Sequence, residues 1–188
     1  MNYPNYIRII GGKWRGRKLV VLKNPGLRPT SSRMRETLFN WLQPVIKEAQ
    51  CLDCFAGTGA LGFEALSRGV SNVTLLEINR LASKQLIQSA SKLQTKKAKI
   101  ITTNSLHWLA RNGSSFNIVF IDPPFYHNEL ITVTINALNQ YQRLKRNAWI
   151  YIETEATNQE ANKIVPSHWK KHREKNTSQV SYRLYFSP

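Results

Sequence analysis

Between residues 51 and 153 short apolar segments alternate with helical stripes, and this alternation restricts the fold more than any other feature of the sequence. The apolar segments are rich in β-branched and aromatic residues, as buried strands are. We expect strands at 51–55, 72–77, 98–103, 116–121 and 148–153, and helices near 60–68, 81–93, 106–111 and 130–141. Strands that alternate with helices predict an α/β fold, in which a mostly parallel sheet carries helices on both faces.

The two ends of the chain depart from this pattern. At the start, residues 6–22 contain two alternating stretches around a glycine-rich basic loop, which predicts a β-hairpin, and Thr30-Ser31-Ser32 then signals the start of a helix. At the other end, residues 169–175 and 180–186 predict an antiparallel pair at the sheet edge. We therefore expect a seven-stranded, mostly parallel sheet with an antiparallel C-terminal edge strand. It would form a domain at 50–188, preceded by a hairpin-and-helix extension at 1–49.

The net charge of +16 and the pI near 10.2 predict a polyanionic partner. Ten Lys and Arg residues lie in the first 47 positions, against Glu36 alone. Such local charge density favours phosphate contacts, so nucleic acid is the first candidate, an anionic membrane surface the second and an ordinary basic surface the third. The candidate RNA-binding residues are Arg8, Lys13, Arg15, Arg17, Lys18, Arg28, Arg33 and Arg35.

Neither a membrane nor a metal is expected. No apolar run approaches the roughly 18 residues of a membrane span, and residues 1–10 lack a signal-peptide core, which predicts a cytoplasmic protein. Cys51 and Cys54 form a C-x-x-C pair, the spacing of redox and zinc sites. In a strand, however, positions three apart face opposite sides, so we interpret both as buried apolar residues. The four histidines show no ligand spacing.

A glycine loop follows the first predicted strand of the alternating region. Gly57, Gly59 and Gly62 form a G-x-G-x-x-G pattern between that strand and a helix, where free backbone N–H groups suit a pyrophosphate or the carboxylate of S-adenosylmethionine. Asp53, just before the loop, favours the second ligand, because a carboxylate attracts an ammonium group and repels a pyrophosphate.

Polar residues also end the next two strands. Glu77 could accept hydrogen bonds from both hydroxyls of a ribose, and the amide of Asn104, which precedes Ser105, could reach an adenine edge. Each could instead be an ordinary strand-end cap. Because the carboxyl ends of parallel strands meet at one edge, their agreement with the glycine loop favours a nucleotide-like ligand.

The fourth strand ends in Asp122-Pro123-Pro124-Phe125. Two prolines stiffen the turn and leave its carbonyls free to accept hydrogen bonds. A carboxylate, a rigid carbonyl and an aromatic ring could together hold a planar group that bears an amine, although a plain capped turn is the alternative.

Together these motifs resemble the class I S-adenosylmethionine-dependent methyltransferases that modify exocyclic amines. Further stretches are similar to the bacterial RsmD family, which methylates N2 of one guanine in 16S ribosomal RNA. The matching stretches are 8–12, 15–19, 28–30, 33–42, 59–69, 172–175 and 180–185. Two positions depart from the pattern of related enzymes: Asn79 stands where an acidic residue is common, and Thr58 replaces a serine.

The resemblance implies a Rossmann-like fold, S-adenosylmethionine as cofactor, and a substrate in the small ribosomal subunit. It makes Asp122, Pro123, Pro124 and Phe125 the catalytic residues. The implied cofactor-binding residues are Asp53, Phe55, Ala56, Gly57, Thr58, Gly59, Glu77, Ile78, Asn104, Ser105 and Asp122. A DNA adenine methyltransferase, a glutamine methyltransferase and a non-enzymatic RNA-binding module are the alternatives.

Overall fold

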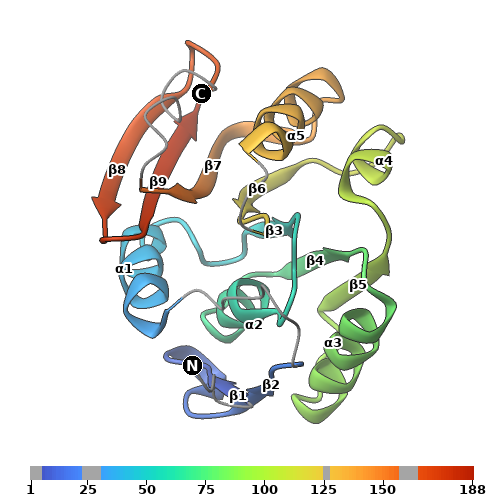
Figure 1. The fold of residues 1–188 in the computed structure, drawn as a ribbon. Coiled ribbons are helices and arrows are strands. Elements are labelled where there is room, and N and C mark those ends of the chain that lie inside the picture. The colour runs from blue at the N-terminus through green and yellow to red at the C-terminus, as the bar shows by residue number, and fades with distance from the viewer. Residues whose placement is uncertain (1–5, 23–30, 125–127, 157–164) are drawn as a thin grey trace.

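A seven-stranded sheet with the strand order β5-β4-β3-β6-β7-β9-β8 forms the centre of the computed structural model (Figure 1). The structure describes residues 6–22, 31–124, 128–156 and 165–188. The five parallel strands are β3 (Gln50–Asp53), β4 (Asn72–Glu77), β5 (Ala98–Thr102), β6 (Phe116–Ile121) and β7 (Leu144–Glu155). The antiparallel part consists of β9 (Val180–Ser187), which pairs with β7, and β8 (Lys170–Asn176), which pairs with β9.

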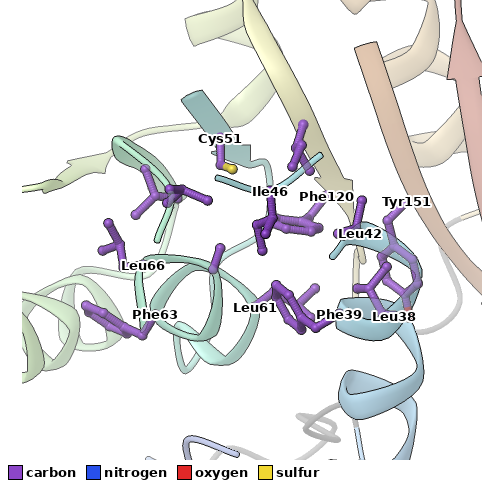
Figure 2. Packing of buried hydrophobic residues seen from close by; sticks show 14 of the residues in the cluster. Leu38, Phe39, Leu42, Ile46, Cys51, Leu61, Phe63, Leu66, Phe120 and Tyr151 are labelled. Carbon is purple, nitrogen blue, oxygen red and sulfur yellow. The ribbon is translucent and has the colours of Figure 1, made fainter. Parts of the chain in front are cut away.

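Helices cover both faces of the sheet, as the alternation predicts. The helices are α1 (Ser32–Leu42), α2 (Ala60–Ser67), α3 (Arg80–Lys92), α4 (Ser105–Leu109) and α5 (Asn128–Gln140). One core cluster joins the sheet to α1, α2 and α3, and a second joins its other face to α4 and α5. In the first cluster, Phe39 of α1 and Phe63 of α2 lie in the layer beneath Phe120 and Tyr151 (Figure 2).

The two cysteines lie on opposite faces of the sheet, as their spacing predicts. Cys51 belongs to the first core cluster and Cys54 to the second, and both are free thiols with no exposed surface. Burial raises the pKa of the Cys51 thiol, so the thiol stays protonated. Neither residue is placed for redox or metal chemistry.

The amino-terminal segment shares the first core cluster. A short hairpin of β1 (Tyr6–Arg8) and β2 (Lys18–Val20) holds the 3₁₀ turn η1 (Gly12–Trp14), and Ile9, Trp14 and Leu19 are buried. The hairpin is shorter than predicted because the Gly-Gly segment turns the chain into η1. Ser31 caps α1 by accepting a hydrogen bond from the Met34 N–H at 3.2 Å.

Strand β7 differs most from its prediction, since it begins at Leu144 rather than near Ala148. Residues 145–147 are polar, so the sequence pattern does not indicate that the strand begins before them. The register with β6 shifts between Phe116 and Ile118. Asn147 has a φ of 62°, as expected where a strand is irregular. Within the described residues no helix has the length and apolarity to span a membrane.

Candidate active site

Three carboxylates meet where β4, β3 and β6 end. Asp53 is the last residue of β3, Glu77 is the last residue of β4, and Asp122 directly follows β6. The charges of Asp122 and Glu77 both act on Asp53, so the three groups are close in space. The structure thus brings together the acids that the sequence places at three separate strand ends.

Asp53 lies deepest, with 2% of its surface exposed. Burial raises its pKa to about 7, and the neighbouring Asp122 and Glu77 add to the shift. Hydrogen bonds from the backbone N–H groups of Phe55 and Gly62 oppose it. A bound cation would relieve this repulsion, so the strand ends would favour a positively charged ligand.

The glycine loop is tied to Glu77. The Oε2 of Glu77 accepts the N–H of Gly57 at 2.8 Å, and its Oε1 accepts the N–H of Asn79 at 2.8 Å. Gly57 and Gly59 have φ angles of 51° and 75°, which glycine adopts without strain. Glu77 therefore orients the loop, while each of its oxygens retains a further lone pair for a ligand.

Asn79, which stands where related enzymes often have an acidic residue, caps α3. Its Oδ1 accepts the N–H groups of Leu81 at 2.9 Å and Ala82 at 3.1 Å. Ile78 beside it is 67% exposed, an unusual environment for an isoleucine, and could lie against a flat apolar ring.

Asn104 and Ser105 are engaged within the fold. Asn104 caps α4, because its Oδ1 accepts the N–H groups of Leu106 at 2.9 Å and His107 at 3.2 Å. The Ser105 hydroxyl donates to the carbonyl of Cys54. The capping alternative therefore holds for Asn104, although both bonds use Oδ1 alone. The Ser105 hydroxyl ties α4 to the end of β3, and cofactor binding by Ser105 stays a prediction.

The turn that follows β6 is partly buried. Pro123 is buried and Pro124 is exposed, while Phe125 and His127 fall outside the described residues. One acidic residue that the sequence did not single out lies beside Asp122. Glu153 of β7 ends the predicted strand 148–153 beside β6, and that acidic strand end is the signal that could have identified it.

The hairpin presents a cationic surface. Arg8, Lys13, Arg15, Arg17 and Lys18 are all exposed, and so is Arg33 at the start of α1. Arg28 lies outside the described residues. The carbonyl of Gly16 accepts a hydrogen bond from Arg8 at 3.1 Å, which orders part of the loop. These cations are available to a polyanion.

Arg35 does not belong to that surface, which corrects its predicted role in RNA binding. It is 1% exposed, and its Nη1 lies 3.4 Å from Oε2 of Glu64 and donates to the carbonyl of Arg8 at 3.0 Å. Residues two apart on a helix face different sides, so Arg33 points outward where Arg35 points inward. Its spacing to Leu38, Phe39 and Leu42 is the sequence signal for this burial.

Glu64 of α2 anchors the hairpin. Its fully buried carboxylate accepts the N–H groups of Ile10 at 2.8 Å and Gly11 at 2.9 Å, and it pairs with Arg68 at 2.8 Å. Ser67, on the same helix, accepts the N–H of Trp14 at 2.9 Å. Since α2 begins at Ala60, directly after its N-cap Gly59, one helix connects the cationic hairpin to the glycine loop.

No group of three or more His, Cys, Asp or Glu residues among those described is arranged to hold a metal ion. The clustered carboxylates would attract an organic cation by their charge. An ammonium or sulfonium group provides such a charge.

Comparisons with known proteins identify the family of this chain. A family model described as conserved hypothetical protein 95 matches residues 7–186. The ribosomal RNA small subunit methyltransferase D of Escherichia coli K12 is 52% identical, across 98% of this chain and 94% of that protein. The protein of the same name from Haemophilus influenzae is 47% identical, across 98% and 95%.

Solved structures give the same result. The yhhF protein of Escherichia coli superposes with a TM-score of 0.88 at 50% identity, covering 97% of this chain and 98% of that one. The HI0767 protein of Haemophilus influenzae has a TM-score of 0.82 at 42% identity, with the same coverage. The match spans the amino-terminal hairpin as well as the sheet. This chain therefore belongs to the RsmD family of class I methyltransferases.

Proposed function

We propose that this protein transfers a methyl group from S-adenosylmethionine to the exocyclic N2 amine of a guanine in 16S ribosomal RNA. The observation that carries the proposal is the meeting of Asp53, Glu77 and Asp122 at one sheet edge, where the Asp-Pro-Pro turn begins. The names of the relatives support the small-subunit RNA as substrate. Guanine N2 comes from the family resemblance.

The residues present fit this cofactor. S-adenosylmethionine carries an ammonium and a sulfonium, and the clustered carboxylates around buried Asp53 would be relieved by positive charge. Glu77 would accept from ribose hydroxyls with its remaining lone pairs, and exposed Ile78 would pack on the adenine. When bound, the cofactor supplies a methyl group on a sulfonium, whose loss leaves a neutral thioether.

Asp122 and the Pro123 carbonyl would orient the amine. The lone pair of a guanine N2 is delocalised into the ring, and hydrogen bonds from both amine hydrogens favour the pyramidal geometry that frees it. Methyl transfer would form an N–C bond at N2 as the C–S bond of the cofactor breaks. The cationic amine would then release one proton to Asp122 or water, and Phe125 would stack the base.

The exposed cations of the hairpin and Arg33 would hold the RNA backbone. Glu64 docks the hairpin onto α2, so RNA bound to the hairpin cations would be held at a constant position relative to the glycine loop. The target base must leave its stack to reach Asp122. A substrate within the small ribosomal subunit would place the reaction in the cytoplasm.

The central test measures the methylated nucleoside. Labelled S-adenosylmethionine is incubated with undermethylated small subunits, naked ribosomal RNA or DNA, and the product is digested to nucleosides. We expect N2-methylguanosine from the ribosomal substrate, and N6-methyladenosine from DNA would overturn the proposal. Asp122→Ala should abolish transfer while calorimetry still detects cofactor binding; loss of both would make Asp122 structural.

A second test concerns the hairpin. Replacing Arg15 and Arg17 with Ala should weaken RNA binding and reduce the slope of log K against log salt by about 1.4–1.8, because each phosphate contact contributes roughly 0.7–0.9. Lys96→Ala with Lys97→Ala, exposed cations at the opposite end of the strands from the site, is the matched control. Equal slopes in both double variants would remove the hairpin from the interface.

A further inference from the structure

A fourth carboxylate lies beside Asp122. Strands β6 and β7 are parallel neighbours, and their last register pair is Ile121 with Ile152. Asp122 and Glu153 each follow that pair, so they are adjacent across the two strands. Alternation along a strand places Glu153 on the same sheet face as Tyr151, and Asp122 on the same face as Phe120.

Tyr151 holds Glu153 in place. The Tyr151 hydroxyl donates to Oε2 of Glu153 at 2.9 Å, and both residues are buried. The ring of Tyr151 contacts those of Phe120 and Tyr182, at centroid distances of 6.5 Å and 6.4 Å. Burial raises the pKa of Tyr151, and the charges of Glu153 and Asp122 both add to the shift, so this phenol lies close to both carboxylates.

Two neighbouring carboxylates match one base edge in particular. The Watson–Crick edge of guanine presents the N1–H donor beside the N2 amine, so it offers adjacent donors to adjacent acceptors. Adenine and cytosine present an amine beside a ring nitrogen that carries a lone pair. A carboxylate that faces this lone pair would repel it, and buried acceptors left without a donor are costly.

We propose that Glu153 selects guanine by accepting its N1–H, while Asp122 accepts from the N2 amine. This inference rests on the proposed function and names the residue that sets its base specificity. A carboxylate has about four acceptor positions, so Glu153 can receive N1–H and keep the hydrogen bond from Tyr151.

The test compares two bases at the mapped target position of a reconstituted substrate. In 2-aminopurine the amine at position 2 is retained, but N1 carries a lone pair in place of a hydrogen. Wild-type protein should prefer guanine by kcat/KM on the order of 100-fold or more. In Glu153→Gln the amide can donate to N1, so the preference should fall by about 10-fold or more. The missing O6 of 2-aminopurine affects both proteins equally and cancels in this comparison.

Glu48→Gln is the matched control, because Glu48 is exposed just before β3, at the opposite edge of the sheet. It should keep the wild-type preference. Cofactor affinity and Tm of Glu153→Gln show whether the variant folds. If it does not, Tyr151→Phe removes the hydrogen bond that positions Glu153 and should also reduce the preference for guanine.

The outcomes distinguish a failure of this inference from a failure of the proposed function on which it rests. A wild-type protein that forms no N2-methylguanosine would overturn the proposed function. A wild-type protein that forms it, together with a folded Glu153→Gln of unchanged base preference, would overturn the role of Glu153 alone.

Discussion

Replacing Glu64 with Gln should destabilise the protein strongly while leaving side-chain shape almost unchanged. Each carboxylate oxygen of Glu64 receives one backbone N–H and lies near one arginine: Oε2 faces Ile10 and Arg35, and Oε1 faces Gly11 and Arg68. Whichever way the new amide is oriented, its NH₂ group therefore faces two donors. A flip of the side chain cannot restore the contacts.

The magnitude follows from burial. Glu64 and Arg35 are 0% and 1% exposed, so the substitution leaves a buried guanidinium beside a neutral group. Breaking a buried ion pair by removing one partner costs about 3–5 kcal/mol. With a urea m-value of about 2 kcal/mol/M, the unfolding midpoint should fall by about 1.5–2.5 M.

Urea unfolding followed by circular dichroism measures this shift, and amide hydrogen exchange at Ile10 and Gly11 reports whether the hairpin opens first. Glu36→Gln, an exposed glutamate on α1, is the control and should change stability by less than about 0.5 kcal/mol. Adding Arg35→Met to Glu64→Gln should recover part of the loss, because it removes the uncompensated charge. A Glu64→Gln shift as small as that of the control would refute the assignment of Glu64 as a buried anchor.

Three further results are expected. The pKa of Asp53 is 3.8 in its unperturbed state and about 7 in the folded protein, so the folded state binds more protons between these two pH values. The free energy of unfolding therefore falls as pH rises across that window. Urea unfolding at about pH 5 and about pH 8 should show a smaller fall for Asp53→Asn than for the wild-type protein. Gly12→Ala should displace the hairpin and weaken RNA binding while cofactor binding is retained, because the φ of Gly12 is 72° and the new Cβ would lie 1.9 Å from the Ser67 carbonyl oxygen. Gly16 has a φ of 82° but open space around it, so Gly16→Ala should lower the free energy of unfolding in urea by only about 1–2 kcal/mol. Arg143→Met should lower the unfolding free energy by about 3–5 kcal/mol, because this buried guanidinium donates to the carbonyls of four residues around the end of α4; a thermal or urea midpoint near that of wild type would contradict it.

The coupling through α2 has a functional consequence. The hairpin that presents the cations and the loop that follows β3 attach to opposite ends of the same eight-residue helix. Opening of the hairpin would therefore disturb RNA affinity before it disturbs the sheet. Hydrogen exchange in Glu64→Gln, measured alongside RNA and cofactor affinity, would show the order of these losses.

Local pattern alone determined the order of elements and the acids at the strand ends. Buried strands must be apolar and parallel strands end at one edge, so the sequence alone places Asp53, Glu77 and Asp122 together. The opposite facing of Cys51 and Cys54 followed from the two-residue period of a strand. These features depend on backbone geometry, which neighbouring residues specify.

Tertiary structure decided which polar groups remain available. Arg33 and Arg35 carry the same charge in the same helix turn, yet packing against α2 buries one and exposes the other. Asn104 and Ser105 could serve a ligand or a cap, and contacts with α4 and β3 determine their hydrogen bonds. The local pattern shows that β7 ends in an acidic residue, but Glu153 lies beside Asp122 only because β7 pairs with β6, a long-range contact. The sequence thus determines which groups reach the sheet edge, and long-range packing determines which of them face a ligand.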